Sequence, residues 1–97
     1  MHRKAIICED GFEMSVQASA NHYCSPRTDA PATRYDTVEV GFPSQQEDIL
    51  MPYCEDPDKP CETVYAYVPA TQVTLVIVKH GGIVEGELPP GIPYIVA

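Results

Sequence analysis

Alternating apolar and polar residues near the start of the chain predict a β-hairpin. The apolar residues 5–8 form a first strand, and Asp10-Gly11 supplies a turn that favours positive φ angles. Residues 12–18 alternate in polarity, so consecutive side chains point to opposite faces of the returning strand. The apolar face of this strand is expected to carry Phe12, Met14, Val16 and Ala18, and the polar face Glu13, Ser15 and Gln17.

Residues 19–35 lose this periodicity and predict a long connection. Its Pro, Ser, Thr and Asp residues are turn formers, and connections longer than about 12–15 residues in compact domains are usually functional or mobile. Alternation returns over residues 36–42, which predicts a further strand with Val38, Val40 and Phe42 on one side.

A capping-box pattern predicts a short helix after this strand. Ser44 and Glu47 stand three positions apart, the spacing at which two such side chains cap a first helical turn reciprocally. The helix is expected to run through Met51 and to stop at Pro52, because proline cannot continue it. Residues 53–62 are acidic and contain two prolines, which predicts a loop.

The second half of the chain predicts a strand followed by a helix. Residues 63–68 are β-branched and aromatic, which favours a strand. Pro69 suits the first position of a helix, and apolar residues and a histidine follow at helical spacing: Val73, Val76, Ile77 and His80. Gly81-Gly82 supplies a left-handed C-cap. The β-branched content of residues 70–79 leaves a strand as the alternative.

These elements predict a single α+β domain over residues 1–97. We expect a small, mainly antiparallel sheet of about four strands, with one or two short helices on one face. Residues 83–97 contain three prolines, so an edge strand is expected to lead into a Pro-rich C-terminal extension over residues 84–97. The expected core residues are Val16, Val38, Val40, Val64, Val68, Val73 and Ile77.

The chain carries 6 Lys and Arg against 14 Asp and Glu, a net charge of −8. This charge argues against general nucleic-acid binding, because neutralising phosphates requires clustered basic residues. It is also unevenly placed, since residues 1–34 are neutral overall and residues 47–62 sum to −5. The expected acidic partner surface contains Glu47, Asp48, Glu55, Asp56, Asp58 and Glu62.

Neither a secretory signal nor a membrane segment is expected. The apolar stretch near the N-terminus spans only residues 5–8, and the longest aliphatic run, residues 73–78, is far short of the roughly 20 residues of a membrane helix. We therefore expect a soluble protein in the cytoplasm. Four cysteines are then expected to be reduced, with a zinc site as the alternative despite the lack of a C-x-x-C pair: Cys8, Cys24, Cys54 and Cys61.

Catalytic motifs are missing from the sequence. It has no G-x-S-x-G, no phosphate-cradling glycine loop and no H-E-x-x-H. Cys24 would need a base as a nucleophile, and His22 would point to the opposite side if both lay in one strand. We expect neither enzymatic activity nor a cofactor.

The long connection holds the densest set of candidate binding residues. His22 offers an imidazole, Tyr23 can stack, and Arg27 offers a planar fork for phosphate or carboxylate. With Gln17, these side chains are able to bind an anionic small molecule or a partner loop. The alternative is that they only satisfy the loop's own backbone. Tyr65 and Tyr67 have same-face spacing and suit either base stacking or sheet packing.

Five short strings resemble a group of small accessory proteins of bacteriophages and prophages. The resemblance covers residues 11–83 and rests on residues 14–19, 22–27, 38–43, 63–69 and 80–82. It implies a non-enzymatic protein that binds and neutralises a component of bacterial antiviral immunity. Such a protein acts either by docking on a host immune protein through its acidic surface or by sequestering an anionic nucleotide signal. The alternatives are a structural or virion-associated protein and a small zinc-binding module.

Self-association is also expected. A small sheet with exposed edges and tyrosine-bearing faces gains stability when a second copy covers them. The expected assembly is a homodimer or a higher homo-oligomer.

Overall fold

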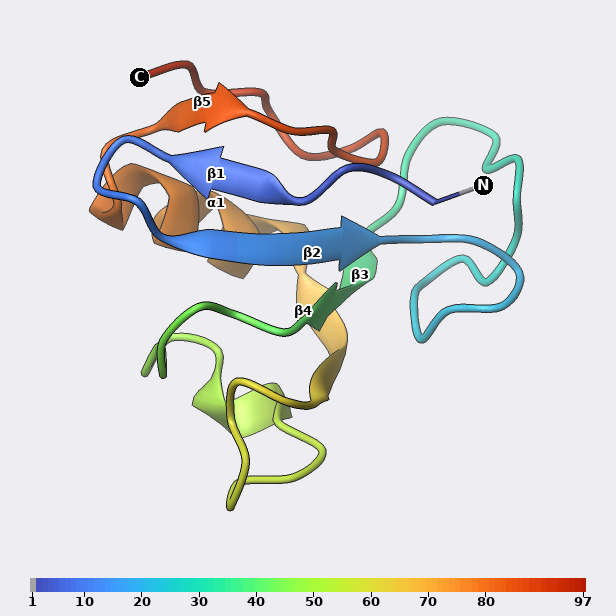
Figure 1. The fold of residues 1–97 in the computed structure, drawn as a ribbon. Coiled ribbons are helices and arrows are strands. Elements are labelled where there is room, and N and C mark those ends of the chain that lie inside the picture. Colours follow the sequence, from blue (N-terminus) through green and yellow to red (C-terminus); the bar gives the residue numbers. More distant parts are fainter. Residues whose placement is uncertain (1) are drawn as a thin grey trace.

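Within residues 2–97, five antiparallel strands form one sheet in the order β4-β3-β2-β1-β5, with a single α-helix on one face (Figure 1). The computed structural model describes residues 2–97. The elements are β1 (Ile6–Cys8), β2 (Glu13–Gln17), β3 (Thr37–Gly41), the 3₁₀ helix η1 (Met51–Tyr53), β4 (Val64–Pro69), α1 (Ala70–Lys79) and β5 (Ile83–Glu85). The predicted α+β class is confirmed. The sheet has five strands because β5 pairs with β1.

The predicted N-terminal hairpin forms between β1 and β2, with Ile6 opposite Met14. Its turn is longer than the expected two residues, because the Cys8 N–H donates to the Phe12 carbonyl and three residues, 9–11, lie between the two. Gly11 supplies the positive φ, at 92°. The apolar face of β2 is buried as predicted.

Helix α1 confirms the helical interpretation of residues 70–79. Val73, Val76 and Ile77 are buried against the sheet. Two glycines after the helix have φ near 90°, and the Gly82 N–H donates to the Ile77 carbonyl at 2.9 Å, so the left-handed cap forms as predicted. Pro69 differs from expectation, because it ends β4 and caps the helix instead of starting it.

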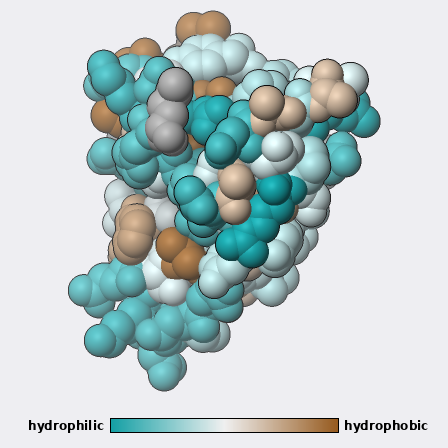
Figure 2. Space-filling model, turned by 90° about the vertical axis from the view of Figure 1, so that its right-hand side faces the viewer, coloured by the Kyte–Doolittle hydropathy of each residue, from teal (hydrophilic) through white to brown (hydrophobic). Residues whose placement is uncertain are grey.

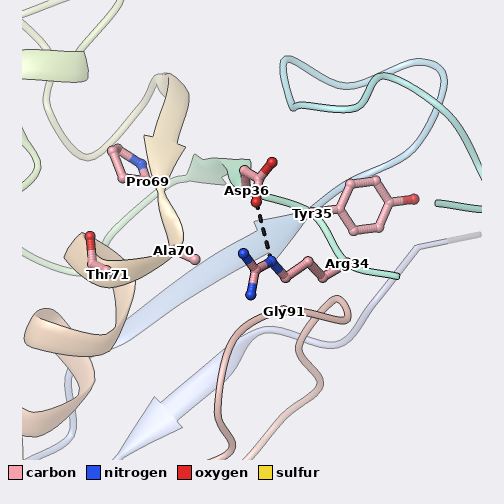
Figure 3. A pocket seen from close by; sticks show the side chains of 7 residues that line it. All are labelled: Arg34, Tyr35, Asp36, Pro69, Ala70, Thr71 and Gly91. Atoms are coloured by element: carbon pink, nitrogen blue, oxygen red, sulfur yellow. Dashed lines mark hydrogen bonds and ion pairs between the residues drawn. The ribbon is translucent and has the colours of Figure 1, made fainter. Parts of the chain in front are cut away.

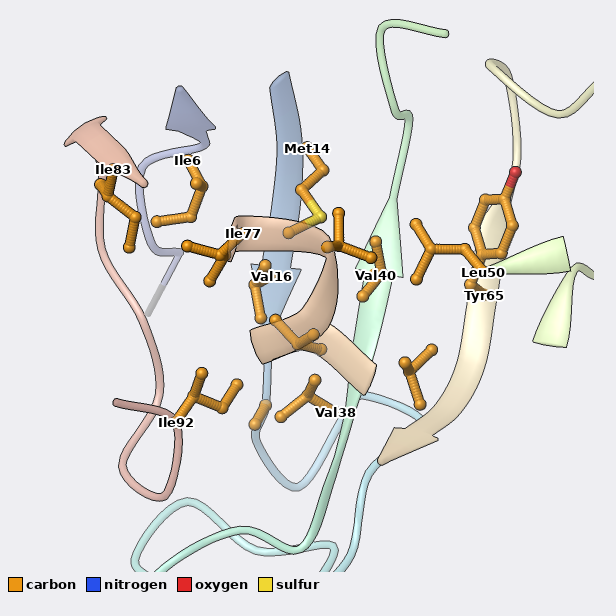
Figure 4. Close-up of a cluster of buried hydrophobic side chains, with 14 of the residues drawn as sticks. Ile6, Met14, Val16, Val38, Val40, Leu50, Tyr65, Ile77, Ile83 and Ile92 are labelled. Atoms are coloured by element: carbon orange, nitrogen blue, oxygen red, sulfur yellow. The ribbon is translucent and has the colours of Figure 1, made fainter. Parts of the chain in front are cut away.

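The hydrophobic core lies between α1 and the sheet (Figure 4). Six of the seven predicted core residues are fully buried: Val16, Val38, Val40, Val68, Val73 and Ile77. Val64 is only half-buried, because it pairs with Gly41 on the sheet face opposite Tyr65. Tyr65 and Leu50 fill the η1 end of the core, and Ile83 fills the β5 end (Figure 4).

No α-helix forms over residues 44–51, so the capping-box prediction is wrong. The Ser44 hydroxyl accepts from the Glu13 N–H at 3.0 Å, and the Ser44 N–H donates to the Glu13 carbonyl at 2.8 Å. Ser44 therefore pairs with the chain entering β2, and the Glu47 side chain turns inward. Turns lead to η1, which contains Pro52 instead of stopping before it.

Residues 86–97 fold back along the molecule. The Ile83 N–H donates to the Ile95 carbonyl at 2.7 Å, and the Ala97 N–H donates to the Ile83 carbonyl at 3.0 Å. Ile92 is buried in the core. The C-terminus thus covers part of the outer edge of β5.

Candidate functional site

The middle of the long connection between β2 and β3 is hydrogen-bonded to the start of β3. Cys24 is buried. The Ser25 N–H donates to the Thr37 carbonyl at 3.2 Å, and the Asp36 N–H donates to the Ser25 carbonyl at 2.7 Å. The segment that bears the candidate binding residues therefore has a defined position.

A β-bulge in β4 sets the directions of its two tyrosines. Ala66 and Tyr67 together lie opposite the single residue Glu39 of β3. Tyr67 has a φ of 52°, in the left-handed region that bulky residues rarely adopt. Tyr65 is fully buried, whereas Tyr67 is 45% exposed. The prediction that these tyrosines share one face is wrong, because the extra residue reverses the alternation.

Tyr23, Arg27 and Tyr67 meet at the surface and form what we call the aromatic–arginine patch. The Tyr23 backbone is hydrogen-bonded to the bulge. The Tyr23 carbonyl accepts from the Tyr67 N–H at 3.1 Å, and the Tyr23 N–H donates to Glu39 Oε1 at 3.1 Å. The two tyrosine rings lie 5.9 Å apart between centroids and are tilted by 41°. The Arg27 guanidinium carbon lies 5.4 Å from the centroid of the Tyr23 ring. The patch thus offers two exposed rings and one cation.

Gln17 and His22 lie outside this patch and form hydrogen bonds within the chain. The buried Gln17 amide donates to the Arg3 carbonyl at 2.8 Å and accepts from the Arg3 N–H at 3.0 Å. His22 Nδ1 lies 2.6 Å from Ser19 Oγ within the same loop. These two polar side chains satisfy nearby groups of the chain, whereas Tyr23 and Arg27 face solvent.

Residues 47–62 form an acidic lobe that projects beyond β4 (Figure 1). The lower end of the molecule is covered with hydrophilic side chains (Figure 2). Five predicted surface acids are exposed there: Asp48, Glu55, Asp56, Asp58 and Glu62. Glu47 is the exception. Its residue is 1% exposed, so its assignment to the acidic surface is wrong.

The backbone of the acidic lobe is fixed to the core. Leu50 is fully buried, and the Tyr65 hydroxyl donates to the Pro60 carbonyl at 2.7 Å. The Glu55 N–H donates to the Val64 carbonyl at 3.1 Å, which ties the lobe to the start of β4. The exposed acidic side chains therefore project from a backbone that is attached to the core.

Glu47 and His80 form the buried centre of an ionic cluster whose outer members, Asp10 and Lys79, are half exposed. His80 Nε2 lies 2.7 Å from Glu47 Oε1, and His80 Nδ1 lies 2.6 Å from Asp10 Oδ2. The Lys79 ammonium lies 3.0 Å from the Glu47 carboxylate. The Phe12 ring stacks on the imidazole at 4.1 Å between centroids. The cluster joins the β1–β2 turn, the base of the acidic lobe and the end of α1.

This geometry favours a protonated His80. Burial disfavours the charged imidazole, but the hydrogen bonds to Glu47 and Asp10 outweigh it and raise the pKa of His80. Burial likewise opposes the charge on Glu47, yet the Ile49 N–H and His80 together with Lys79 lower its pKa. The Phe12 N–H and then His80 lower the pKa of Asp10. When both ring nitrogens donate to these carboxylates, no lone pair is left on the imidazole to act as a general base.

Three surface hollows lie elsewhere on residues 2–97. The first, of about 230 Å³, lies at the start of α1 and is lined by Arg34, Asp36 and Thr71 (Figure 3). Arg34 Nε lies 3.3 Å from Asp36 Oδ1, so its charge is already paired. A mostly apolar hollow of about 510 Å³ adjoins it near Leu75. A third hollow, of about 370 Å³, lies beside Cys61 on the sheet face that α1 does not cover.

All four cysteines are free thiols. Cys8 and Cys24 are buried, Cys54 is half-buried and Cys61 is exposed. Burial, followed by the charge of Asp10, raises the pKa of the Cys8 thiol. Within residues 2–97, no three His, Cys, Asp or Glu side chains form an arrangement that holds a metal ion. No zinc site is built from these cysteines.

The ionic cluster was not predicted from the sequence. His80 is separated from Glu47 by 33 positions and from Asp10 by 70. No local motif links such distant residues. The available signal was a histidine on the apolar stripe of a predicted helix, because a core histidine requires polar partners.

Comparisons of the chain with protein-family models, curated proteins and solved structures find no match. In residues 2–97, no helix has the length and apolar character required to cross a membrane.

Proposed function

We propose that this is a non-enzymatic binding protein of the cytoplasm whose acidic lobe docks on a basic surface of a partner protein. The observation that carries the proposal is the display of five exposed carboxylates on a lobe anchored by Leu50 and Tyr65. Lys59 is the only basic residue among residues 47–62. The lobe is therefore a concentrated negative surface.

A rigid acidic lobe suits this role for two physical reasons. Clustered charge of one sign steers an oppositely charged partner and accelerates the encounter. A lobe that is already ordered loses less conformational entropy on binding than a flexible acidic segment does. Both effects favour a partner with a basic groove, such as a protein that binds nucleic acid.

The proposed partner is a component of bacterial antiviral immunity. The support is the resemblance of residues 11–83 to phage accessory proteins, together with the basic grooves by which nucleic-acid-handling proteins hold their substrates. In this role the lobe occupies such a groove and excludes the nucleic acid. A structural or virion-associated role would require no such partner.

Two charge variants of equal net charge test the role of the lobe. The lobe variant combines Glu55→Gln, Asp58→Asn and Glu62→Gln, whose side chains are exposed. The control variant combines three exposed acids elsewhere: Glu9→Gln, Glu13→Gln and Glu85→Gln. Each variant changes the net charge from −8 to −5.

Immobilised wild type, lobe variant and control variant are exposed to lysate of bacteria that carry an antiviral immune system. We expect the wild type and the control variant to retain a nucleic-acid-binding partner that elutes with salt, and the lobe variant to lose it. Native mass spectrometry of the eluate reports the stoichiometry and any homodimer. Equal loss by both variants, or retention by both, would refute docking through the lobe.

A further inference from the structure

We infer that the aromatic–arginine patch is a binding site for a single small nucleotide, separate from the acidic lobe. The nucleobase stacks on the exposed ring of Tyr67 or Tyr23, and the Arg27 guanidinium holds the phosphate. Both tyrosines are accessible, at 45% and 40% exposure. This inference uses different residues from the docking proposal and stands or falls independently of it.

Arg27 is the arginine whose guanidinium remains available. The Arg3 guanidinium donates to the Ala18 carbonyl, and that of Arg34 pairs with Asp36. The ion pairs and hydrogen bonds among residues 2–97 include none from the Arg27 guanidinium. Its central carbon lies 5.4 Å from the centroid of the Tyr23 ring, so the group sits beside an aromatic ring while its N–H groups keep no protein acceptor among residues 2–97. A planar fork of this kind matches phosphate oxygens.

The two tyrosine rings retain surface for a base. Their planes are tilted by 41° and their centroids are 5.9 Å apart, so they do not cover each other completely. Nucleobases stack on such exposed aromatic side chains in a sequence-tolerant way. A stacked base and a phosphate within reach of Arg27 together describe a nucleotide.

The backbone holds Tyr67 in this position at an energetic cost. Its φ of 52° is unfavourable for a side chain with a Cβ atom, and glycine or asparagine adopts such an angle more readily. Costly backbone conformations occur preferentially at functional sites. The chain places a tyrosine here and directs its ring to solvent.

The charge distribution favours a mononucleotide over a nucleic-acid strand. A strand brings many phosphates, and the net charge of −8 with its acidic lobe repels them. One phosphate needs only the local cation. The Glu39 carboxylate beside the patch is engaged by the Tyr23 N–H.

The test is NMR titration of the ¹⁵N-labelled protein with adenosine 5′-monophosphate. We expect saturable shifts centred on the amides of Tyr23, Arg27 and Tyr67. Adenosine and inorganic phosphate alone should each bind at least about fivefold more weakly, since each retains one of the two contacts. An oligodeoxyadenylate of eight residues should bind no better than the mononucleotide.

Two substitutions separate binding from folding. Tyr67→Gly relieves the unfavourable φ, so the folded spectrum should persist while binding weakens at least about fivefold. Phe42→Gly is its matched control, because Phe42 is an exposed aromatic with the same φ of 52° outside the patch. Arg27→Gln should abolish the difference in affinity between adenosine 5′-monophosphate and adenosine, whereas Arg34→Gln should retain it.

The inference is overturned by shifts that lie elsewhere, by unchanged affinity in Tyr67→Gly and Arg27→Gln, or by the lack of saturable binding. Stronger binding of the oligonucleotide would also overturn it, because a strand-binding surface would then be the correct assignment.

Discussion

At the scale of single residues, His80 shows how burial and charge combine in this protein. Its imidazole is almost inaccessible, yet both nitrogens face carboxylates, from Glu47 and Asp10. A buried charge of this kind is tolerated because each polar atom has a partner. Lys79 adds a second cation to the Glu47 carboxylate.

The cluster predicts a pH-dependent stability. The raised pKa of His80 contributes stability that is complete below the ordinary histidine value of about 6.5 and is lost as pH rises through the folded value. The lowered pKa values of Glu47 and Asp10 contribute stability that is lost as pH falls through their folded values. The free energy of unfolding, measured by urea denaturation, should therefore decline above about pH 6.5.

Removal of the imidazole isolates this contribution. His80→Gln leaves the buried Glu47 with a weaker partner and should cost about 3 kcal/mol, the low end for breaking a buried pair because Lys79 remains. The variant should also lose the decline of stability above neutral pH, whereas His22→Gln should keep it. An unchanged pH profile in His80→Gln would show that the cluster is not the cause.

At the scale of elements, the sequence predicts correctly those helices and strands whose formation depends on local hydrophobic periodicity. Hydrophobic periodicity identified the hairpin and α1, since burial of one face stabilises each. The Ser44–Glu47 pattern failed because both side chains form tertiary contacts, with Glu13 and His80. The bulge at Tyr67 left no trace in the alternation of β4. Its register depends on β3 and on the Tyr23 backbone.

The C-cap of α1 requires glycine, and the loss of stability on substitution by alanine measures this requirement. Gly82 has a φ of 90°, and an added Cβ atom would lie 2.8 Å from the Ala97 backbone. Gly11 has a φ of 92°, but an added Cβ atom there meets no atom within 4 Å. Gly11→Ala should cost about 1–2 kcal/mol from backbone strain alone, and Gly82→Ala should cost more.

Hydrogen exchange locates the additional cost. In Gly82→Ala, the amide of Ala97, which bonds to the Ile83 carbonyl, should lose protection. In Gly11→Ala this amide should stay protected. Equal losses of stability in the two variants would contradict the close packing of the C-terminus against the helix cap.

At the scale of the whole molecule, the charge is separated into distinct regions. The sequence located most of the −8 in residues 47–62, and the structure displays five of those six acids on a projecting lobe. The sixth, Glu47, is the internal anchor of that lobe, which only the fold reveals. The sequence predicts Tyr23 and Arg27 as binding residues of the long connection. Their contact with Tyr67 depends on the β-bulge in β4, which turns the Tyr67 ring to the surface.

Phage plating tests the central claim most directly. The wild type, the lobe variant and the control variant are each expressed in bacteria whose antiviral immune system blocks a phage. We predict that the wild type and the control variant restore plaque formation and that the lobe variant, folded and equally abundant, does not. Restoration by the lobe variant, or failure of the wild type in cells whose immune protein it captures, would contradict the account.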